Sequence, residues 1–288
     1  MTPTVKFLFG FLVPHSIVTL RNQHRLRAMR KQRLANQACV PTLHASEQPY
    51  SYEAALEHLK HLGVDPVHLI AGSIPESSLW FVSQHLPRVA RPGCPLTILH
   101  VGNFVGVSLC YITAACASLH AQSLVVAIDP NIKHRGVEAP QRIVTRLLSH
   151  FGLQHNVLLI CGYSLKKNLA DDGFVFQARD ADIESRFADD AAPEDVLANL
   201  DALCGQLFDV AVLDGNHSGE YLEAELQFVL RLLKPEGLLV FDDVTSGWPE
   251  IRNVFCRLSE GDARNSGITD GRVGILYVTT GSAPAVAL

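Results

Sequence analysis

The stretch FDVAVLDGNHSGEYLEAELQFVLRLLKPEGLLVFDDV, residues 208–244, joins two short apolar runs through one amphipathic segment. Asp214 follows the first run, and the pair Asp242–Asp243 follows the second. Short apolar runs of this kind are typical of buried parallel strands. Because a strand, a crossover helix and a parallel strand bring both strand ends to one edge of a sheet, we expect these three carboxylates to converge.

The segment between the two runs is predicted to be a helix over residues 220–233, because its apolar residues recur with a spacing near 3.6. The sequence KPEG at 234–237 interrupts this pattern and is predicted to form a turn before the next strand.

Similar apolar runs recur through the chain and alternate with helix-like segments, which is typical of a parallel sheet covered by helices on both faces. The predicted strands are 96–101, 124–128, 157–161, 208–213 and 238–241, and the predicted helices are 51–62, 80–89, 108–119, 140–150 and 220–233. Asp270–Gly271, followed by the run 274–278, predicts a closing hairpin. We therefore predict an α/β fold: a doubly wound, Rossmann-like, mostly parallel seven-stranded sheet with a C-terminal hairpin.

The charge distribution divides the chain into an arm and a domain. Residues 1–46 carry seven basic residues and no acid, which leaves 17 basic and 29 acidic residues, a net charge of −12, for residues 47–288. An insert at 171–201 holds ten acidic residues against two arginines, and we expect a solvated surface insert, with a lid over the site as the alternative. The acidic domain argues against nucleic acid as the main partner.

The N-terminal arm contains an apolar run at 5–14, which is too short to span a bilayer. Residues 5–33 fit an interfacial segment, in which apolar side chains enter a membrane surface and the following arginines meet anionic lipid. The alternative is a helix packed on the domain or on a second subunit of a homo-oligomer. The seven cysteines are scattered and form no CxxC pair, which indicates reduced thiols in a cytoplasmic protein. This location includes a peripheral protein at the inner face of a membrane.

The sequence HVGNFVGVS at 100–108 follows the first strand and predicts a cofactor-binding turn. Gly102 and Gly106 allow the backbone to approach a ligand, and the next helix offers free N–H groups. Asp129 ends the second strand, where a carboxylate can accept both hydroxyls of a ribose. The wide glycine spacing, with Phe104 between, disfavours a nicotinamide-dependent oxidoreductase.

The chain resembles the class I S-adenosylmethionine-dependent methyltransferases, specifically the family related to macrocin O-methyltransferase and other metal-dependent small-molecule and sugar O-methyltransferases. The resemblance covers about residues 65–280 and is carried by LDGNHS at 213–218, LLKPEGLLVFDD at 232–243 and GRVGIL at 271–276. It implies O-methylation of a small hydroxylated acceptor such as a sugar or secondary metabolite. The implied cofactor residues are Gly102, Gly106, Asp129, Ser73 and Ser164, and the implied ligands of a divalent cation are Asp214, Asp242 and Asp243.

Two residues depart from the family pattern. His100 stands where the first-strand motif usually has an acid, and Asn216 stands where the second Asp of Asp-Gly-Asp-His could act as a base. These departures leave open a cofactor-binding scaffold with weak or no activity. The basic arm leaves open an RNA methyltransferase.

Methyl transfer to a hydroxyl requires an acceptor oxygen that is deprotonated and held in line. Mg²⁺ or Mn²⁺ on the three carboxylates would lower the acceptor's pKa and relieve the repulsion among Asp214, Asp242 and Asp243. The structural alternative is that Asp243 caps a helix and Asp242 turns outward. We predict His217 as the general base at the site with Asp214; the alternative is that this histidine only orients the loop.

Overall fold

The computed structural model describes residues 50–165, 196–204, 207–261 and 266–278. The predicted arm at 1–46 and the part of the acidic insert up to residue 195 lie outside these ranges. The end of that insert, 196–201, belongs to helix α10 (Val196–Cys204), in which Leu197 is fully buried. In the part of the chain that the structure describes, no helix is long and apolar enough to cross a membrane.

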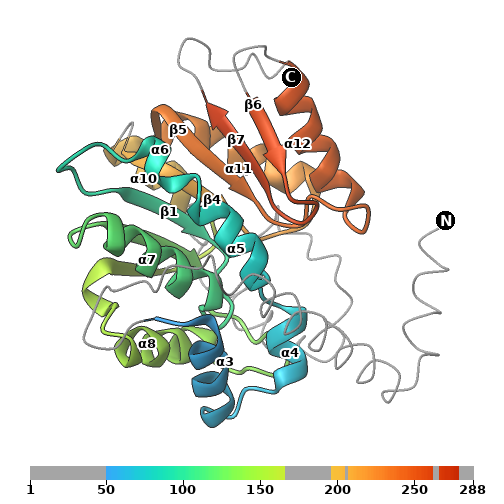
Figure 1. The fold of residues 1–288 in the computed structure, drawn as a ribbon. Coiled ribbons are helices and arrows are strands. Elements are labelled where there is room, and N and C mark those ends of the chain that lie inside the picture. Colours follow the sequence, from blue (N-terminus) through green and yellow to red (C-terminus); the bar gives the residue numbers. More distant parts are fainter. Residues whose placement is uncertain (1–49, 166–195, 205–206, 262–265, 279–288) are drawn as a thin grey trace, which may run out of the picture.

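One seven-stranded sheet forms the centre of the molecule, as predicted (Figure 1). Its strand order is β3-β2-β1-β4-β5-β7-β6. Its strands are β1 (Thr97–Val101), β2 (Leu124–Asp129), β3 (Val157–Cys161), β4 (Phe208–Leu213), β5 (Leu233–Phe241), β6 (Ser266–Thr269) and β7 (Gly274–Val278). Strands β1 to β5 are parallel, and β7 pairs antiparallel with both β5 and β6. The C-terminal hairpin is therefore confirmed.

Helices cover both faces of the sheet (Figure 1). On one face lie α3 (Tyr52–His61), α5 (Glu76–Ser83), α6 (Leu86–Val89), α7 (Val107–Leu119) and α8 (Pro140–His150); the other carries α10, α11 (Gly219–Leu232) and α12 (Pro249–Gly261). The remaining helices are α4 (Pro66–Ala71) and the 3-10 turn Gln154–Asn156. Alternate residues of β4 serve the two cores: Val210 and Val212 belong to the first, Ala211 and Leu213 to the second.

Two predicted elements differ from the structure for identifiable reasons. The segment predicted as one helix at 80–89 is divided between α5, which ends at Ser83, and α6. Pro87 lacks the N–H that would bond to the carbonyl of Ser83 in a continuous helix. The KPEG turn lies within β5, where the register shifts between the pairs Phe208↔Leu233 and Val210↔Leu238. The strand therefore begins five residues earlier than predicted, at Leu233.

Candidate functional site

The carboxylates predicted to converge do so at the carboxyl edge of the sheet. Strands β4 and β5 are parallel and in register at Leu213↔Phe241, so Asp214 and Asp242 leave neighbouring strands at the same level. The amide of Asp242 also donates a 3.1 Å hydrogen bond to the carbonyl of Leu213. Burial and the neighbouring carboxylate of Asp242 raise the pKa of Asp214 well above its ordinary value.

Asp242 and Asp243 both point inward, with exposed fractions of 5% and 4%. Neighbouring residues of a regular strand face opposite sides, but Asp243 has a φ of 60°, in the left-handed region. This conformation breaks the alternation after β5, and both carboxylates then meet one guanidinium. Asp242 therefore does not turn outward, and the outward alternative considered from the sequence is wrong.

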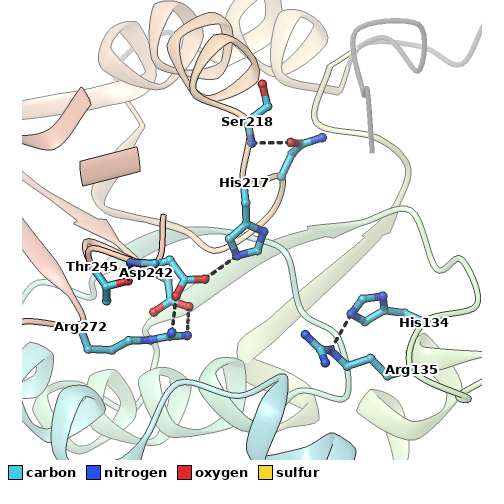
Figure 2. Close-up of polar contacts among 10 residues, drawn as sticks. His134, Arg135, His217, Ser218, Asp242, Thr245 and Arg272 are labelled. Atoms are coloured by element: carbon cyan, nitrogen blue, oxygen red, sulfur yellow. Dashed lines mark hydrogen bonds and ion pairs between the residues drawn. The ribbon is translucent and has the colours of Figure 1, made fainter. Parts of the chain in front are cut away.

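That guanidinium belongs to Arg272, which sequence reasoning missed. Its Nη2 lies 2.7 Å from Oδ2 of Asp242, and its Nη1 forms an ion pair with Asp243 (Figure 2). Arg272 lies in the turn before β7, and its carbonyl accepts a 2.9 Å hydrogen bond from the amide of Val244. The hairpin signal marks the turn that carries Arg272, but only the antiparallel pairing of β7 with β5 places this residue beside the end of β5.

Arg272 supplies part of the positive charge that the carboxylates require. Burial raises the pKa of Asp242, while the charge of Arg272 opposes that shift. The net effect of its three acidic neighbours is to raise the pKa of Arg272 itself, although burial acts in the opposite direction. Because one guanidinium faces three carboxyl groups, a second cation or a bound proton is needed to balance them.

His217 lies over the same cluster, as expected for a general base. Its Nε2 is 2.7 Å from Oδ2 of Asp243 (Figure 2). Its ring packs against the indole of Trp248 with centroids 4.4 Å apart. Asn216, at the position where a second Asp would stand, has a local role: its Oδ1 accepts a 2.8 Å hydrogen bond from the amide of Ser218. The amide side chain therefore shapes the loop that carries the histidine.

The donor set fits a divalent cation. Asp214, His217 and Asp242 each offer a ligand atom, and these atoms lie within 4.8 Å of one another. Among the described residues, Oδ1 of Asp242 is a buried acceptor without a hydrogen-bond partner, which suits a metal ligand. Two carboxylates with one imidazole suit Mn²⁺ at least as well as Mg²⁺, which prefers oxygen ligands alone. The geometry thus brings His217, rather than Asp243, next to Asp214 and Asp242. Its imidazole can act there either as a metal ligand or as a base, because a ring nitrogen that ligates a cation no longer accepts a proton.

The predicted cofactor loop is held close to this cluster. Gly102 and Gly106 both have positive φ, 84° and 88°, and Gly106 is the N-cap of α7. A Cβ at residue 102 would lie 2.0 Å from the carbonyl oxygen of Asp214, so only glycine fits there.

Asp129 fastens two loops to the end of β2. One carboxylate oxygen accepts hydrogen bonds from the amides of Asn103 and Phe104, at 2.8 and 3.2 Å, and the other accepts from Asn131 at 2.8 Å. These bonds oppose the rise in the pKa of Asp129 that its burial causes. Asp129 therefore shapes the loop of Gly102 and Gly106 in addition to the ribose role expected of it.

The two serines implied by the resemblance lie in different surroundings. Ser73 is nearly buried in the loop between α4 and α5. A Cβ on its neighbour Gly72 would meet the side chains of Phe104 and Arg135, so this loop reaches the loops after β1 and β2. Ser164 instead faces α11, where its hydroxyl donates to Glu225 and lies 3.0 Å from the hydroxyl of Tyr221.

Glu225 is a further buried acid that sequence reasoning missed. It is 1% exposed, and burial raises its pKa to about 8 although the Ser164 hydroxyl opposes the shift. A small pocket is lined by Asp214, Asn216, His217, Glu225, Asp242 and their apolar neighbours. Glu225 therefore lines the same pocket as Asp214 and Asp242 of the carboxylate cluster.

His100 is fully buried on β1, where the family pattern has an acid. Both of its ring nitrogens are buried. Burial lowers the pKa of His100 to about 4, so this residue is neutral at physiological pH. The position therefore lacks the negative charge of the usual acid.

A family described as a methyltransferase domain matches residues 99–244, slightly more than half of the chain. The chain belongs to this methyltransferase family. The match contains the glycine loop, Asp129, the carboxylate cluster and His217. The S-adenosylmethionine-dependent methyltransferase predicted from the sequence is thereby confirmed at the level of the enzyme class.

Solved structures share the fold of this methyltransferase at low sequence identity. An O-methyltransferase from Bacillus cereus in complex with SAH has a TM-score of 0.53 and 16% identity, covering 86% of this chain and 96% of that one. An SAH-bound methyltransferase from Podospora anserina gives 0.53 and 14%, covering 88% and 96%. A putative caffeoyl-CoA O-methyltransferase from Staphylococcus aureus gives 0.51 and 12%, covering 90% and 99%.

Among curated proteins, glutamate–tRNA ligase 1 from Campylobacter curvus is 25% identical over 161 residues. The aligned region is 53% of the methyltransferase but 34% of the ligase. The chain thus spans about a third of that relative's length. This match carries no conclusion about activity.

Proposed function

We propose that this methyltransferase transfers the methyl group of S-adenosylmethionine to a hydroxyl of a small acceptor with two adjacent oxygens, such as a sugar or a catechol-like metabolite. The supporting observation is the His217–Asp243 pair, which lies beside the carboxylate cluster and at the same sheet edge as the glycine loop. A base and an oxygen-binding cluster are the groups that hydroxyl methylation requires. The macrocin-related family remains our proposal for the closest functional relatives.

The proposed cofactor site comprises Gly102 and Gly106 at the start of α7, with Asp129 toward the ribose. Backbone amides occupy three of the four lone pairs of the Asp129 carboxylate, which leaves one, on Oδ1, for a ribose hydroxyl. Ser73 belongs to a loop that approaches this site, whereas the contacts of Ser164 favour a supporting role behind it.

For the chemical step, we propose that His217 accepts the proton of the acceptor hydroxyl. The carboxylate of Asp243 stabilises the resulting imidazolium and holds the ring, which also packs against Trp248. Asp214 and Asp242 would hold a divalent cation, Mg²⁺ or Mn²⁺. Such a cation, when bound, lowers the pKa of an acceptor hydroxyl and orients adjacent oxygens. The contacts of Asp243 with Arg272 and His217 favour an orienting role for this residue over a ligand role.

The five cysteines with described side chains, among them Cys110 and Cys116 in the core, are all free, which supports the cytoplasmic location that we propose. We also propose that residues 5–33, which lie outside the described ranges, contact a membrane surface. A homo-oligomer is a separate proposal.

The test is a calorimetric titration of S-adenosylmethionine and of Mn²⁺ into the full chain, followed by methyl transfer to 3,4-dihydroxybenzyl alcohol and to a panel of sugars. We expect Asp129→Ala to lose cofactor binding and Asp214→Ala to lose Mn²⁺ binding. Asp201→Ala, which removes a carboxylate paired with Arg231 at the surface, should lose neither. Cofactor binding without turnover on any acceptor would favour the scaffold, and no cofactor binding would refute the proposal.

A further inference from the structure

A tight turn after β2 presents an arginine at the edge of the sheet that carries the site. His134 and Val137 exchange two backbone hydrogen bonds, of 3.1 and 2.9 Å, around the central residues Arg135 and Gly136. Both central residues have positive φ, 47° and 79°. Such turns favour Asn, Asp or Gly at their first central position. An arginine there is strained, and strain of this kind is concentrated at functional sites.

Neighbouring loops fix the direction of the Arg135 side chain. Its Cδ packs over Gly72, where a Cβ would lie only 3.1 Å away, and the same glycine makes room for the ring of Phe104. Phe104 also meets the ring of His134 edge-on, with centroids 5.2 Å apart. Figure 2 shows the Arg135 guanidinium directed toward the part of the site that holds His217, Asp242 and Arg272.

The guanidinium of Arg135 has unused hydrogen-bonding capacity. Its Nε donates a 3.1 Å bond to Nε2 of His134, and among the described residues it forms no ion pair. The nearby cations differ in this respect, since Arg272 pairs with Asp242 and Lys133 pairs with Glu138 at 3.0 Å. Partial burial lowers the pKa of Arg135, and the charge of Asp243 opposes this shift. A guanidinium remains charged at neutral pH and presents a fork that matches carboxylates.

We propose that Arg135 binds a carboxylate of the methyl acceptor. The proposal rests on the proposed function and specifies its substrate class: a hydroxylated acid. In Figure 2 the guanidinium of Arg135 is directed toward His217, the residue assigned to the acceptor hydroxyl. The charge of Asp243, which bonds His217, also acts on Arg135. A carboxylate of the cofactor is the other source of the same chemistry, and the experiment separates the two.

The experiment compares two probes that share a catechol ring and differ in charge, 3,4-dihydroxybenzoate and 3,4-dihydroxybenzyl alcohol. Each is titrated calorimetrically into the full chain saturated with SAH and Mn²⁺. We expect wild type to bind the acid at least tenfold more tightly than the alcohol, as for a charge-assisted pair. Arg135→Gln should lose this preference and leave the affinity for the alcohol within about twofold. Arg142→Gln, the same change at an exposed position on α8, should behave as wild type.

Arg135→Asn is the second variant, since asparagine is favoured in this turn and its folding is not in question. The proposal is overturned if both variants bind the two probes as wild type does, or lose affinity for both equally. It is also overturned if the variants lose affinity for SAH instead, because the guanidinium then serves the cofactor. Methyl transfer to the alcohol by wild type and variants alike separates these outcomes from failure of the proposed function, in which neither probe is bound or methylated.

Discussion

The guanidinium of Arg272 lies 2.7 Å from the carboxylate of Asp242, although the first residue belongs to the C-terminal hairpin and the second follows a central parallel strand. The same guanidinium pairs with Asp243. The hairpin thus contributes directly to the electrostatics of the site, and closing the sheet neutralises part of the charge at its carboxyl edge.

Replacing Arg272 with methionine should destabilise the protein. Removing one partner of a buried ion pair costs about 3–5 kcal/mol, and the partial exposure of Arg272 places the expected loss near the lower end, about 3 kcal/mol. Urea unfolding in the presence of a chelator measures this loss. The control is Arg257→Met, which breaks an exposed pair with Glu223 and should cost less than about 1 kcal/mol. Equal losses in the two variants would contradict the assignment of Arg272 as a buried counter-ion.

Glu225 should make the protein less stable as pH rises toward 8. Burial raises the pKa of this residue to about 8 in the folded chain, whereas the unfolded carboxyl releases its proton near 4.5. The unfolded state therefore binds fewer protons than the folded state between pH 4.5 and 8. The stability that the protonated Glu225 contributes is lost as the pH rises through this range. The free energy of unfolding should fall less steeply between pH 6.5 and 8 in Glu225→Gln than in wild type. Glu220→Gln, exposed on the same helix, should retain the wild-type slope.

His100 should have the opposite effect in acid. Burial lowers its folded pKa to about 4, below its ordinary value of 6.5, so the unfolded chain alone takes up a proton as the pH falls between them. Stability contributed by the neutral imidazole is complete above about 6.5 and declines toward pH 4 by up to about 1.4 kcal/mol per pH unit. Unfolding of His100→Gln at pH 7, 6 and 5 should show a shallower decline. His155→Gln, at an exposed position, provides the comparison, and an unchanged slope in His100→Gln would refute the prediction.

His217 and Asp243 should act as one unit in catalysis. With 3,4-dihydroxybenzoate as acceptor, His217→Ala and Asp243→Asn should each lower kcat by about 10²–10⁴-fold, the range expected for loss of general base catalysis. Because the carboxylate acts through the imidazole, the double variant should be little worse than His217→Ala alone. KM for the cofactor should change little in any of the three. If the fold-loss of kcat in the double variant equals the product of the two single losses, Asp243 acts independently of His217.

The sequence predicted the sheet and its active edge because both follow from local patterns. The four residues that end each strand, Val210–Leu213 and Leu238–Phe241, are all apolar, as expected of strand segments buried on both faces. Parallel pairing then dictates that Asp214 and Asp242 meet. The Asp270–Gly271 turn likewise predicted the hairpin. These features depend on residues near one another in the chain.

Features that depend on tertiary pairing could not be obtained in this way. Arg272 meets Asp242 only because β7 pairs with β5, and nothing local marks this arginine as a counter-ion. The left-handed backbone at Asp243 was equally hidden, since strand alternation predicts opposite faces for neighbouring carboxylates. Ser164 was matched to the pocket by sequence position, while its hydroxyl meets Glu225 on a helix more than fifty residues away.

The approach of Gly102 to the backbone of Asp214 ties the cofactor loop to the carboxylate cluster without any side chain between them. A methyl group at residue 102 would have to displace the strand end that carries Asp214, so Gly102→Ala would disturb both binding functions through a single change. In a random-mutant library selected for methyl transfer, position 102 should tolerate no substitution. Gly93 has open space around it but a φ of 71°, so it should tolerate residues that accept the left-handed region, such as asparagine. A change at residue 102 therefore affects the cofactor loop and the carboxylate cluster together.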